Sequence, residues 1–438
     1  MINLYDITYG AGIAAAAPIW LLKSNARAKI RRAFADRMGD VPTRVGDCPA
    51  IMLHAVSLGE MNATLAMVRE LLAQNAPLHV IISTTTQTGY SRGQELYGQN
   101  PKVALVHYPL DFSSSIQRFL DRLKPAVVVL MELEVWPNFV LHCQRRGIPV
   151  LLVNGRLTAG SFKNYRLGGS VMRRMFGRLT QVCAQDQIYA GRFIALGAPK
   201  DRVSVTGTMK FDTAQIADRI PGDGELAAAL KLPTDQPIWV CGSTGPGEEQ
   251  LLLGVYRQLL QSHPTLRLVI VPRKPERFDE VASLITTAGF ALVRRSTLAS
   301  NAPADAVILG DTMGELRKFY SLARVVFVGR SLVDFGSRQH GSDMIEPAAL
   351  AKPTAVGPFT GNFAEVMRKF REAQAMAEVS TPVELVAQLD RFLTDPPSAS
   401  AMGLRARSVV ERERGATHRH VEIILKTIAD VQNRCRAK

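Results

Sequence analysis

The chain has few cysteines for its length, and none of them has the spacing of a disulfide scaffold or a zinc site. Five are scattered over 438 residues: Cys48, Cys143, Cys183, Cys241 and Cys435. His418 and His420 form an H-x-H pair, but no acidic or thiol cluster surrounds them, so both are predicted to be surface histidines. A reducing compartment is expected, and no metal or cofactor.

Aromatic residues are also scarce, and no segment is of low complexity. They make up 7% of the chain, and the basic residues are spread along it rather than gathered between aromatics. A nucleic-acid-binding protein would show a concentrated basic face, so no nucleic-acid partner is expected. The net charge is nevertheless +14, from 53 Lys and Arg against 39 Asp and Glu. This excess favours an anionic partner, either a membrane surface or a phosphorylated substrate, with a solvated surface as the alternative.

The sequence lacks an apolar run of full bilayer length. Residues 7–22 carry no charge, but they are short for a span and contain Pro18. No basic residue precedes them, which argues against a signal peptide. Basic residues follow at Lys23, Arg27, Lys29, Arg31 and Arg32. The pattern indicates a membrane-interface anchor with the rest of the chain cytoplasmic. A helix packed on the protein's own core is the alternative, and whether the segment spans the membrane or lies on it stays open.

The rest of the chain alternates short apolar runs with helical stretches. Runs at 50–56, 78–84, 103–110, 125–134, 148–155, 179–185 and 203–207 predict the strands of a first half. A second set lies at 237–244, 266–272, 290–296, 306–311, 323–329, 352–357 and 373–379. Such runs are typical of parallel sheets covered on both faces.

We therefore predict an α/β fold with two Rossmann-like domains that face a central cleft. The expected parts are a membrane-associating segment (1–35), a first Rossmann-like domain (36–212), a linker with a short helix (213–236), a second Rossmann-like domain (237–395) and a helical tail (396–438).

Each half opens with a strand, a turn of small residues and a helix start that carries an acid. These segments are HAVSLGE (54–60) and VCGSTGPGEEQ (240–250). Helix N-termini suit anions, and glycines let a phosphate approach the backbone closely. Ser57 and Glu60 also match the Ser-x-x-Glu capping box. Two roles for Glu60 stay open: a helix cap, or a base that takes a proton from a substrate.

Other charged residues follow predicted strands. In MELEVWPN (131–138), Glu132 and Glu134 share one face if the strand continues, although surface acids that begin a helix are the alternative. VTGTMKFD (205–212) places Lys210 at the end of the first half. VPRKPERF (271–278) ends a strand with Arg273 and Lys274, which suits a phosphate or carboxylate.

At these positions the sequence resembles the 3-deoxy-D-manno-octulosonic acid (Kdo) transferases of lipopolysaccharide synthesis. The resemblance runs from the N-terminus to about residue 400. The motifs occur in the family order: HAVSLGE, MELEVWPN, VNGRLTAGSFKNY, VTGTMKFD, GSTGPGEE, VPRKPERF, GDTMGEL, FVGRSLV, EPAALAKP and GPFTGNF.

The resemblance implies a GT-B glycosyltransferase that moves Kdo from CMP-Kdo to a lipid A precursor, with inversion and without a metal, at the cytoplasmic face of the bacterial inner membrane. It makes 36–212 the acceptor domain and 237–395 the CMP-sugar donor domain. It places the catalytic base at Glu60 and its helpers at Glu132 and Lys210, with the acceptor near Ser57 and Gly59. Contacts to the donor are expected at Ser243, Thr244, Pro272, Arg273, Met313, Gly314, Glu315, Asp343, Met344, Ile345, Glu346 and Asn362.

The chain departs from the family pattern near the expected donor site. The family usually has Gly-Gly-His-Asn-Pro-Leu-Glu where this chain has HGSDMIE (340–346), so Ser342 and Asp343 replace His and Asn. The loop DFGSRQ (334–339) and Thr208 also differ. The alternative function is therefore a GT-B transferase or epimerase that acts on a different nucleotide sugar. A non-catalytic membrane scaffold is a third reading, which Glu60, Glu132 and Lys210 oppose.

Overall fold

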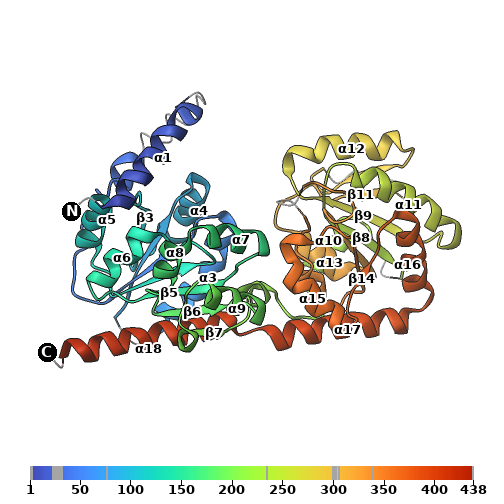
Figure 1. Cartoon of the computed structure of the whole chain (residues 1–438). Coiled ribbons are helices and arrows are strands. Elements are labelled where there is room, and N and C mark those ends of the chain that lie inside the picture. The colour runs from blue at the N-terminus through green and yellow to red at the C-terminus, as the bar shows by residue number, and fades with distance from the viewer. Residues whose placement is uncertain are drawn as a thin grey trace. The chain divides into compact units, whose positions relative to one another are not determined.

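The computed structural model describes residues 3–21, 33–74, 77–232, 235–297, 303, 306–336 and 340–436. The chain divides into two compact units (Figure 1): unit 1 is Met1–Thr213 with Arg414–Lys438, and unit 2 is Ala214–Glu413. Each unit contains one seven-stranded parallel sheet with helices. The predicted α/β class with two Rossmann-like halves is confirmed, and the cleft expected between the halves stays a prediction.

The sheet of unit 1 has the order β3-β2-β1-β4-β5-β6-β7. Its strands are β1 (Ala50–His54), β2 (His79–Thr84), β3 (Val103–His107), β4 (Val127–Met131), β5 (Val150–Gly155), β6 (Gln181–Ala184) and β7 (Val203–Val205). The chain order reverses between β1 and β4, which pair directly. The crevice at the carboxyl ends of two such strands is the usual ligand position in an open α/β sheet.

Helices cover both faces of this sheet because its strands alternate side chains between two apolar clusters. Met52 packs in a cluster with Phe119 and Phe139 of α5 and α6, whereas Ile51 belongs to a cluster with Val68 of α3. The helices are α1 (Leu4–Leu21), α3 (Leu58–Leu72), α4 (Gln87–Tyr97), α5 (Ser113–Leu123), α6 (Pro137–Arg145), α7 (Ala159–Leu167), α8 (Gly169–Phe176), α9 (Gln187–Ala195) and α18 (Ala416–Arg436). Two 3₁₀ turns flank β7: η1 (Lys200–Arg202) and η2 (Met209–Thr213).

The sheet of unit 2 has the order β10-β11-β9-β8-β12-β13-β14, so its chain order reverses between β8 and β12. Its strands are β8 (Ile238–Thr244), β9 (Arg267–Pro272), β10 (Leu292–Arg294), β11 (Val307–Leu309), β12 (Val325–Val328), β13 (Thr354–Val356) and β14 (Ala377–Glu378). Its helical elements are α10 (Asp223–Ala229), α11 (Glu248–Ser262), η3 (Pro275–Arg277), α12 (Phe278–Thr287), α13 (Leu316–Leu322), α14 (Ile345–Ala349), η4 (Gly361–Phe363), α15 (Ala364–Glu372), α16 (Pro382–Thr394) and α17 (Pro396–Glu413).

The units divide the chain differently from the expected linker and tail. Residues 214–232 belong to unit 2, where the hydroxyl of Ser321 donates to the carboxylate of Asp223, the first residue of α10. The expected tail is also divided, because α17 belongs to unit 2 and α18 to unit 1. The carboxylate of Asp212 accepts the N–H groups of Gly415 and Thr417, at 2.6 Å each, where α18 begins.

The uncharged N-terminal stretch forms α1, while Leu22 and the basic residues after it lie outside the described residues. Figure 1 shows α1 projecting from the side of unit 1 that carries α5 and α6. None of the helices that the structure describes has the length and apolar character needed to cross a bilayer.

Candidate functional site

The turn between β1 and α3 holds Glu60 by three hydrogen bonds. The N–H of Val56 donates to Glu60 Oε2 at 2.6 Å, and the hydroxyl of Ser57 donates to Oε1 at 3.2 Å. In return, the N–H of Glu60 donates to Ser57 Oγ at 3.2 Å. This is a capping box whose returning carboxylate reaches the N–H one residue before the cap. The capping role of Ser57 and Glu60 is therefore present in the fold.

The same device occurs at the start of α16 in unit 2. The N–H of Glu384 donates to Thr381 Oγ1 at 3.2 Å, and Glu384 Oε2 accepts the N–H of Ser380 at 2.7 Å. Glu384 is exposed, and its bonds are those of a helix cap. It gives a direct comparison for the capping role of Glu60.

Two further acids lie at the carboxyl end of β4, the strand that pairs with β1. Glu132 has φ +55°, and its N–H donates to the carbonyl of Val153 at 3.0 Å. The indole N–H of Trp136 donates to Glu134 Oε2 at 3.3 Å. Burial raises the pKa of Glu134, the bond from Trp136 opposes that rise, and the charge of Glu132 adds to it. Glu60, Glu132 and Glu134 thus form an acidic cluster where the chain order of the sheet reverses.

This cluster changes the protonation of Glu60. Burial is the largest cause of the change, and the negative charge of Glu132 adds to it, while the hydrogen bond from Val56 acts the other way. Together with a small contribution from Glu134, these effects raise the pKa of Glu60 to about 7. A carboxyl group with such a pKa exchanges protons readily near neutral pH, which suits a general base.

Lys210 lies in η2, which packs against α3 and α18. The N–H of Met209 donates to Asn154 Oδ1 at 3.2 Å, and the N–H of Lys210 donates to Thr208 Oγ1 at 3.4 Å. The fold therefore holds the backbone of Lys210 beside the helix that begins at the Glu60 turn. Because Asp212 caps α18, the same short turn also fixes the C-terminal helix on unit 1.

His420, predicted to lie on the surface, is buried. Its Nε2 lies 2.8 Å from Thr206 Oγ1 and accepts the N–H of Asn154 at 3.4 Å. Burial lowers the pKa of His420 to about 4. The prediction failed because His420 shares the buried stripe of α18 with Ile424 at helical spacing, whereas His418 is exposed and pairs with Glu70.

In unit 2, the predicted donor residues at the carboxyl ends of β8 and β9 lie together. Thr244 and Pro272 are partners across the two strands, next to a register shift at which Ser243 has φ +56°. The N–H of Arg273 donates to the carbonyl of Thr244 at 3.1 Å, which fixes this exposed arginine beside the turn before α11.

The first two acids of α11 are buried and hold the turn in place. Glu248 accepts backbone N–H groups from Gly245 (2.9 Å), Arg330 (2.6 Å), Ser331 (2.8 Å) and Leu332 (2.9 Å). Glu249 accepts the hydroxyl of Thr244 at 2.7 Å and the guanidinium of Arg277 at 2.6 Å. These glutamates therefore join the turn to the neighbouring loops, a role that the motif GSTGPGEE did not reveal.

The remaining donor candidates follow β11, β12 and β13. Met313 is exposed, Gly314 has φ +85°, and Glu315 pairs with Arg295 at 3.0 Å. Burial would raise the pKa of Glu315, but the bonds from Thr312 and Arg295 outweigh it and lower that pKa.

The four predicted donor residues Asp343, Met344, Ile345 and Glu346 lie at the start of α14. Asp343 Oδ1 accepts the N–H of Ile345 at 2.9 Å, and Arg317 donates to Glu346 Oε1 at 2.8 Å. Ser342, which replaces the family's histidine, donates to the carbonyl of Ser243 at 3.2 Å. The N–H of Asn362 donates to the carbonyl of His340 at 3.2 Å, so the altered loop and η4 meet.

The first turns of α1 are joined to unit 1 by a buried polar network. Asp6 Oδ1 accepts the N–H of Ser113 and the side-chain amide of Asn138, both at 2.8 Å. Tyr9 makes an edge contact with Phe112, their ring centroids 5.1 Å apart, and another with Trp136 at 6.4 Å. Since α5 and α6 begin after β3 and β4, α1 is attached at the same edge of the sheet as the acidic cluster.

The helical hairpin α7–α8 carries exposed apolar and basic side chains. No acid occurs between Glu134 and Asp186. Leu167 is 88% exposed and Val171 42%. Five basic side chains of this region have no carboxylate partner among the described residues: Arg156, Lys163, Arg166, Arg173 and Arg174. Such a surface suits an anionic partner with an apolar layer beneath its charges.

Comparison with known proteins decides the family. A family model described as 3-deoxy-D-manno-octulosonic-acid transferase (kdotransferase) matches residues 31–213. A 3-deoxy-D-manno-octulosonic acid transferase of Haemophilus influenzae is 34% identical over 402 residues, which cover 90% of this chain and 91% of that protein. The chain belongs to the Kdo transferase family.

Solved structures agree with the fold of this chain. A glycosyltransferase from Rickettsia africae has a TM-score of 0.58 at 14% identity, covering 87% of this chain and 99% of that one. A UDP-GlcNAc 2-epimerase from Neisseria meningitidis bound to UDP-GlcNAc also scores 0.58, at 15% identity, covering 86% and 100%. At these identities the likeness concerns the GT-B fold alone.

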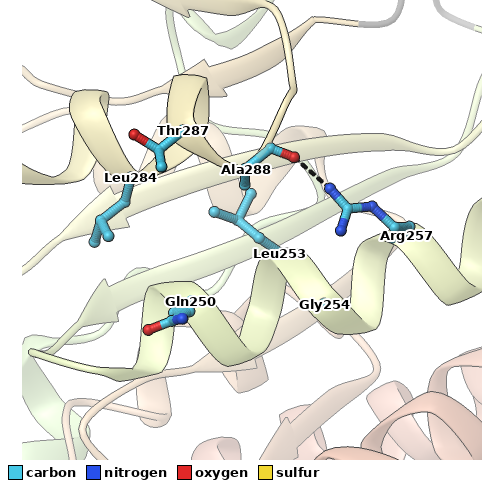
Figure 2. A pocket seen from close by; sticks show the side chains of 7 residues that line it. All are labelled: Gln250, Leu253, Gly254, Arg257, Leu284, Thr287 and Ala288. Carbon is cyan, nitrogen blue, oxygen red and sulfur yellow. Dashed lines mark hydrogen bonds between the residues drawn. The ribbon is translucent and has the colours of Figure 1, made fainter.

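A cavity of about 320 Å³ lies between α11 and α12 (Figure 2). It is lined by Gln250, Leu253, Gly254, Arg257, Leu284, Thr287 and Ala288. None of the predicted site residues lines it. Arg257 closes one side by donating to the carbonyl of Ala288 and by lying over the ring of Phe290.

Proposed function

We propose that this protein transfers Kdo from CMP-Kdo to a lipid A precursor, with inversion at the anomeric carbon and Glu60 as the general base. The single observation that carries the proposal is the raised pKa of Glu60 in an acidic cluster at the reversal point of the unit 1 sheet. Membership of the Kdo transferase family supports the choice of the transferred sugar.

In the proposed reaction, Glu60 removes the proton from a hydroxyl of the acceptor sugar. The freed oxygen forms a bond to the anomeric carbon of Kdo, while the bond to CMP breaks on the opposite face and the phosphate takes the electron pair. Glu132 and Lys210 help to balance the charge that develops. Arg273 and the N-terminus of α11 stabilise the phosphate of the leaving CMP.

The hydrogen bonds around Glu60 support a double role. The bond from the N–H of Val56 orients one oxygen, and the weaker bond from Ser57 holds the other. An acceptor hydroxyl near Ser57 and Gly59 replaces the hydroxyl of Ser57 as the donor to Glu60 Oε1. The bond from the N–H of Val56 to Oε2 keeps the carboxylate in position, and Oε1 receives the proton.

The acceptor is an acylated and phosphorylated disaccharide, so the enzyme works at an anionic membrane surface, in this proposal the cytoplasmic face of the inner membrane. Two features of unit 1 support this location. The helix α1 is attached at the edge of the sheet that carries the acidic cluster, and α7, which follows β5, begins at that same edge. The basic residues of the α7–α8 region that have no carboxylate partner among the described residues bind lipid phosphates. The exposed side chain of Leu167 inserts into the apolar layer beneath the headgroups.

The experiment is incubation of the protein with a lipid A precursor and CMP-Kdo made in situ, with the product read by mass spectrometry. The expected product carries one or more added Kdo residues. Calorimetry with CMP and with UDP distinguishes the alternative, because a transferase or epimerase for a different nucleotide sugar binds UDP in preference to CMP. Absence of any Kdo adduct together with preferential UDP binding contradicts the proposal.

A further inference from the structure

Arg330, the second residue after β12, has a backbone conformation that favours glycine. Its φ is +57°, in the left-handed region where the Cβ of an arginine is crowded. Neighbouring bonds hold it there: its N–H donates to Glu248 Oε2 at 2.6 Å, and its carbonyl accepts the N–H of Gly341 at 2.6 Å. A strained residue that its surroundings fix in this way often marks a functional position.

The side chain of Arg330 lies over the turn that precedes α11. A Cβ built on Gly245 would come within 3.0 Å of Arg330 Cγ, so the absence of a side chain at Gly245 makes room for the arginine. A Cβ on Gly329 would similarly meet Thr244 Cα at 2.6 Å, so β12 and the turn are in close backbone contact. Arg330 is therefore held against the turn formed by residues 243–247.

Arg273 reaches the same turn from the other side. It follows β9, and its N–H donates to the carbonyl of Thr244 at 3.1 Å. Because β8 lies between β9 and β12, the two arginines flank the strand that leads into the turn, at the point where the chain order of the sheet reverses. Burial lowers the pKa of Arg330, and the charge of Arg273 lowers it further, with Glu248 opposing both. The charges of Arg273 and Arg330 are therefore close enough to interact.

We propose that Arg330 and Arg273 form a two-guanidinium fork that binds the phosphate of the nucleotide-sugar donor, which makes Arg330 a donor-binding residue of this chain. The proposal rests on the proposed function. Guanidinium groups offer paired N–H donors that match two oxygens of a phosphate. The 15-residue helix α11 starts behind the turn, and its N-terminal partial charge favours the same anion.

The test uses Arg330→Gly and Arg330→Gln in the full chain, with CMP binding measured by calorimetry. Glycine suits φ +57°, so Arg330→Gly keeps or raises the melting temperature. The dissociation constant for CMP is expected to rise about 10- to 100-fold, as for one lost charge-assisted hydrogen-bond pair. Arg324→Gln is the matched control, because this exposed arginine lies at the opposite end of β12, and its CMP affinity stays that of the wild type.

Binding of cytidine, measured by competition, identifies the group that Arg330 contacts. Arg330→Gly leaves cytidine affinity unchanged if the contact is to the phosphate. Unchanged CMP affinity overturns the fork, and so does an equal loss of CMP and cytidine affinity. A raised KM for CMP-Kdo with unchanged CMP affinity assigns Arg330 to the sugar carboxylate and also overturns it. If the wild type binds UDP instead of CMP, the proposed function fails, whereas the UDP and uridine affinities of the same variants still test the fork.

Discussion

The carboxylate of Glu60 accepts the N–H of Val56 at 2.6 Å, and the carbonyl of the same Val56 accepts the hydroxyl of Thr86 at 2.7 Å. The backbone of one residue, Val56, thus links the first turn of α3 to the cap of α4, the helix that follows the neighbouring strand. The question of cap or base is therefore not a choice between two positions of Glu60. The bond from Val56 holds Oε2, and the proposed proton transfer uses Oε1, which accepts the longer bond from Ser57.

Glu60→Gln separates the two roles. The amide oxygen still accepts the N–H of Val56, so the free energy of unfolding is expected to fall by no more than about 1 kcal/mol. The side chain no longer takes a proton, and the transfer rate is expected to fall about 10²- to 10⁴-fold. Mass-spectrometric product counts and thermal denaturation measure the two effects.

Glu384→Gln is the control for that variant. Its capping bonds at α16 match those of Glu60, and it changes stability by a similar small amount while turnover stays near the wild-type value. A Glu60→Gln enzyme that keeps turnover within a few-fold of wild type contradicts the assignment of the base.

The activity should rise with pH through the pKa of Glu60. A general base must be ionised, so with a pKa of about 7 the value of kcat/KM increases with pH and levels off above that value. Glu134→Gln removes a negative charge that helps to raise this pKa, so the rising limb moves to lower pH. Glu95→Gln, on α4 and paired with Arg92, leaves the limb in place. If Glu134→Gln leaves the rising part of the pH profile of kcat/KM in place, or moves it to higher pH, the charge of Glu134 does not raise the pKa of Glu60.

Much of the architecture follows from sequence because it depends on local pattern. All fourteen apolar runs became strands, since parallel strands that are buried on both faces need continuous apolar residues. The gathering of Glu60 and Glu132 also follows, because residues after neighbouring parallel strands meet at one edge of the sheet.

Features that depend on packing between distant segments were not accessible from local pattern. His420 is buried because α18 returns to unit 1, which requires a contact between residues more than 200 positions apart. The bond between Glu248 and Arg330 likewise depends on the loop after β12 meeting the turn after β8. Arg330 follows a buried strand, as Arg273 does, and that placement is the sequence signal that could have singled it out.

The α7–α8 surface should contribute to membrane binding. Lys163→Gln, Arg166→Gln and Arg174→Gln together remove three unpaired charges, and each cation near an anionic surface contributes about 1 kcal/mol. Partitioning of the full chain onto vesicles that contain phosphatidylglycerol is therefore expected to weaken about tenfold or more, as measured by co-sedimentation.

A matched charge change isolates this surface from the general basicity of the chain. Lys102→Gln, Lys200→Gln and Arg202→Gln remove three exposed charges directly before β3 and β7, at the other edge of the sheet. Equal losses for the two triple variants would assign vesicle binding to net charge alone. Strong binding of either protein to neutral vesicles would instead point to apolar insertion.

Asn138 should hold α1 on unit 1. Its side-chain amide donates to Asp6 Oδ1 and to the carbonyl of Asp111, both at 2.8 Å. Asn138→Ala removes one of the two donors to Asp6 Oδ1 and the amide donor to the carbonyl of Asp111, at a cost of about 1–3 kcal/mol in the free energy of unfolding. Release of α1 makes the helix easier to cleave, which limited proteolysis detects. Asn62→Ala, at an exposed position that accepts a bond from Arg92, is the control. Unchanged cleavage of α1 in Asn138→Ala would show that the aromatic contacts of Tyr9 suffice.

His420 should make the protein sensitive to mild acid. Its folded-state pKa of about 4 lies below the ordinary value of 6.5, so between these values the unfolded chain binds a proton that the folded chain does not. Stability from this residue is present above about pH 6.5 and is lost as the pH falls, by about 2 kcal/mol between pH 7 and pH 5. His420→Gln can still bond to Thr206 and does not titrate, so urea denaturation should show a smaller loss of unfolding free energy over that range. The exposed His418→Gln keeps the wild-type acid sensitivity, and an equal loss in His420→Gln would assign the effect to other groups.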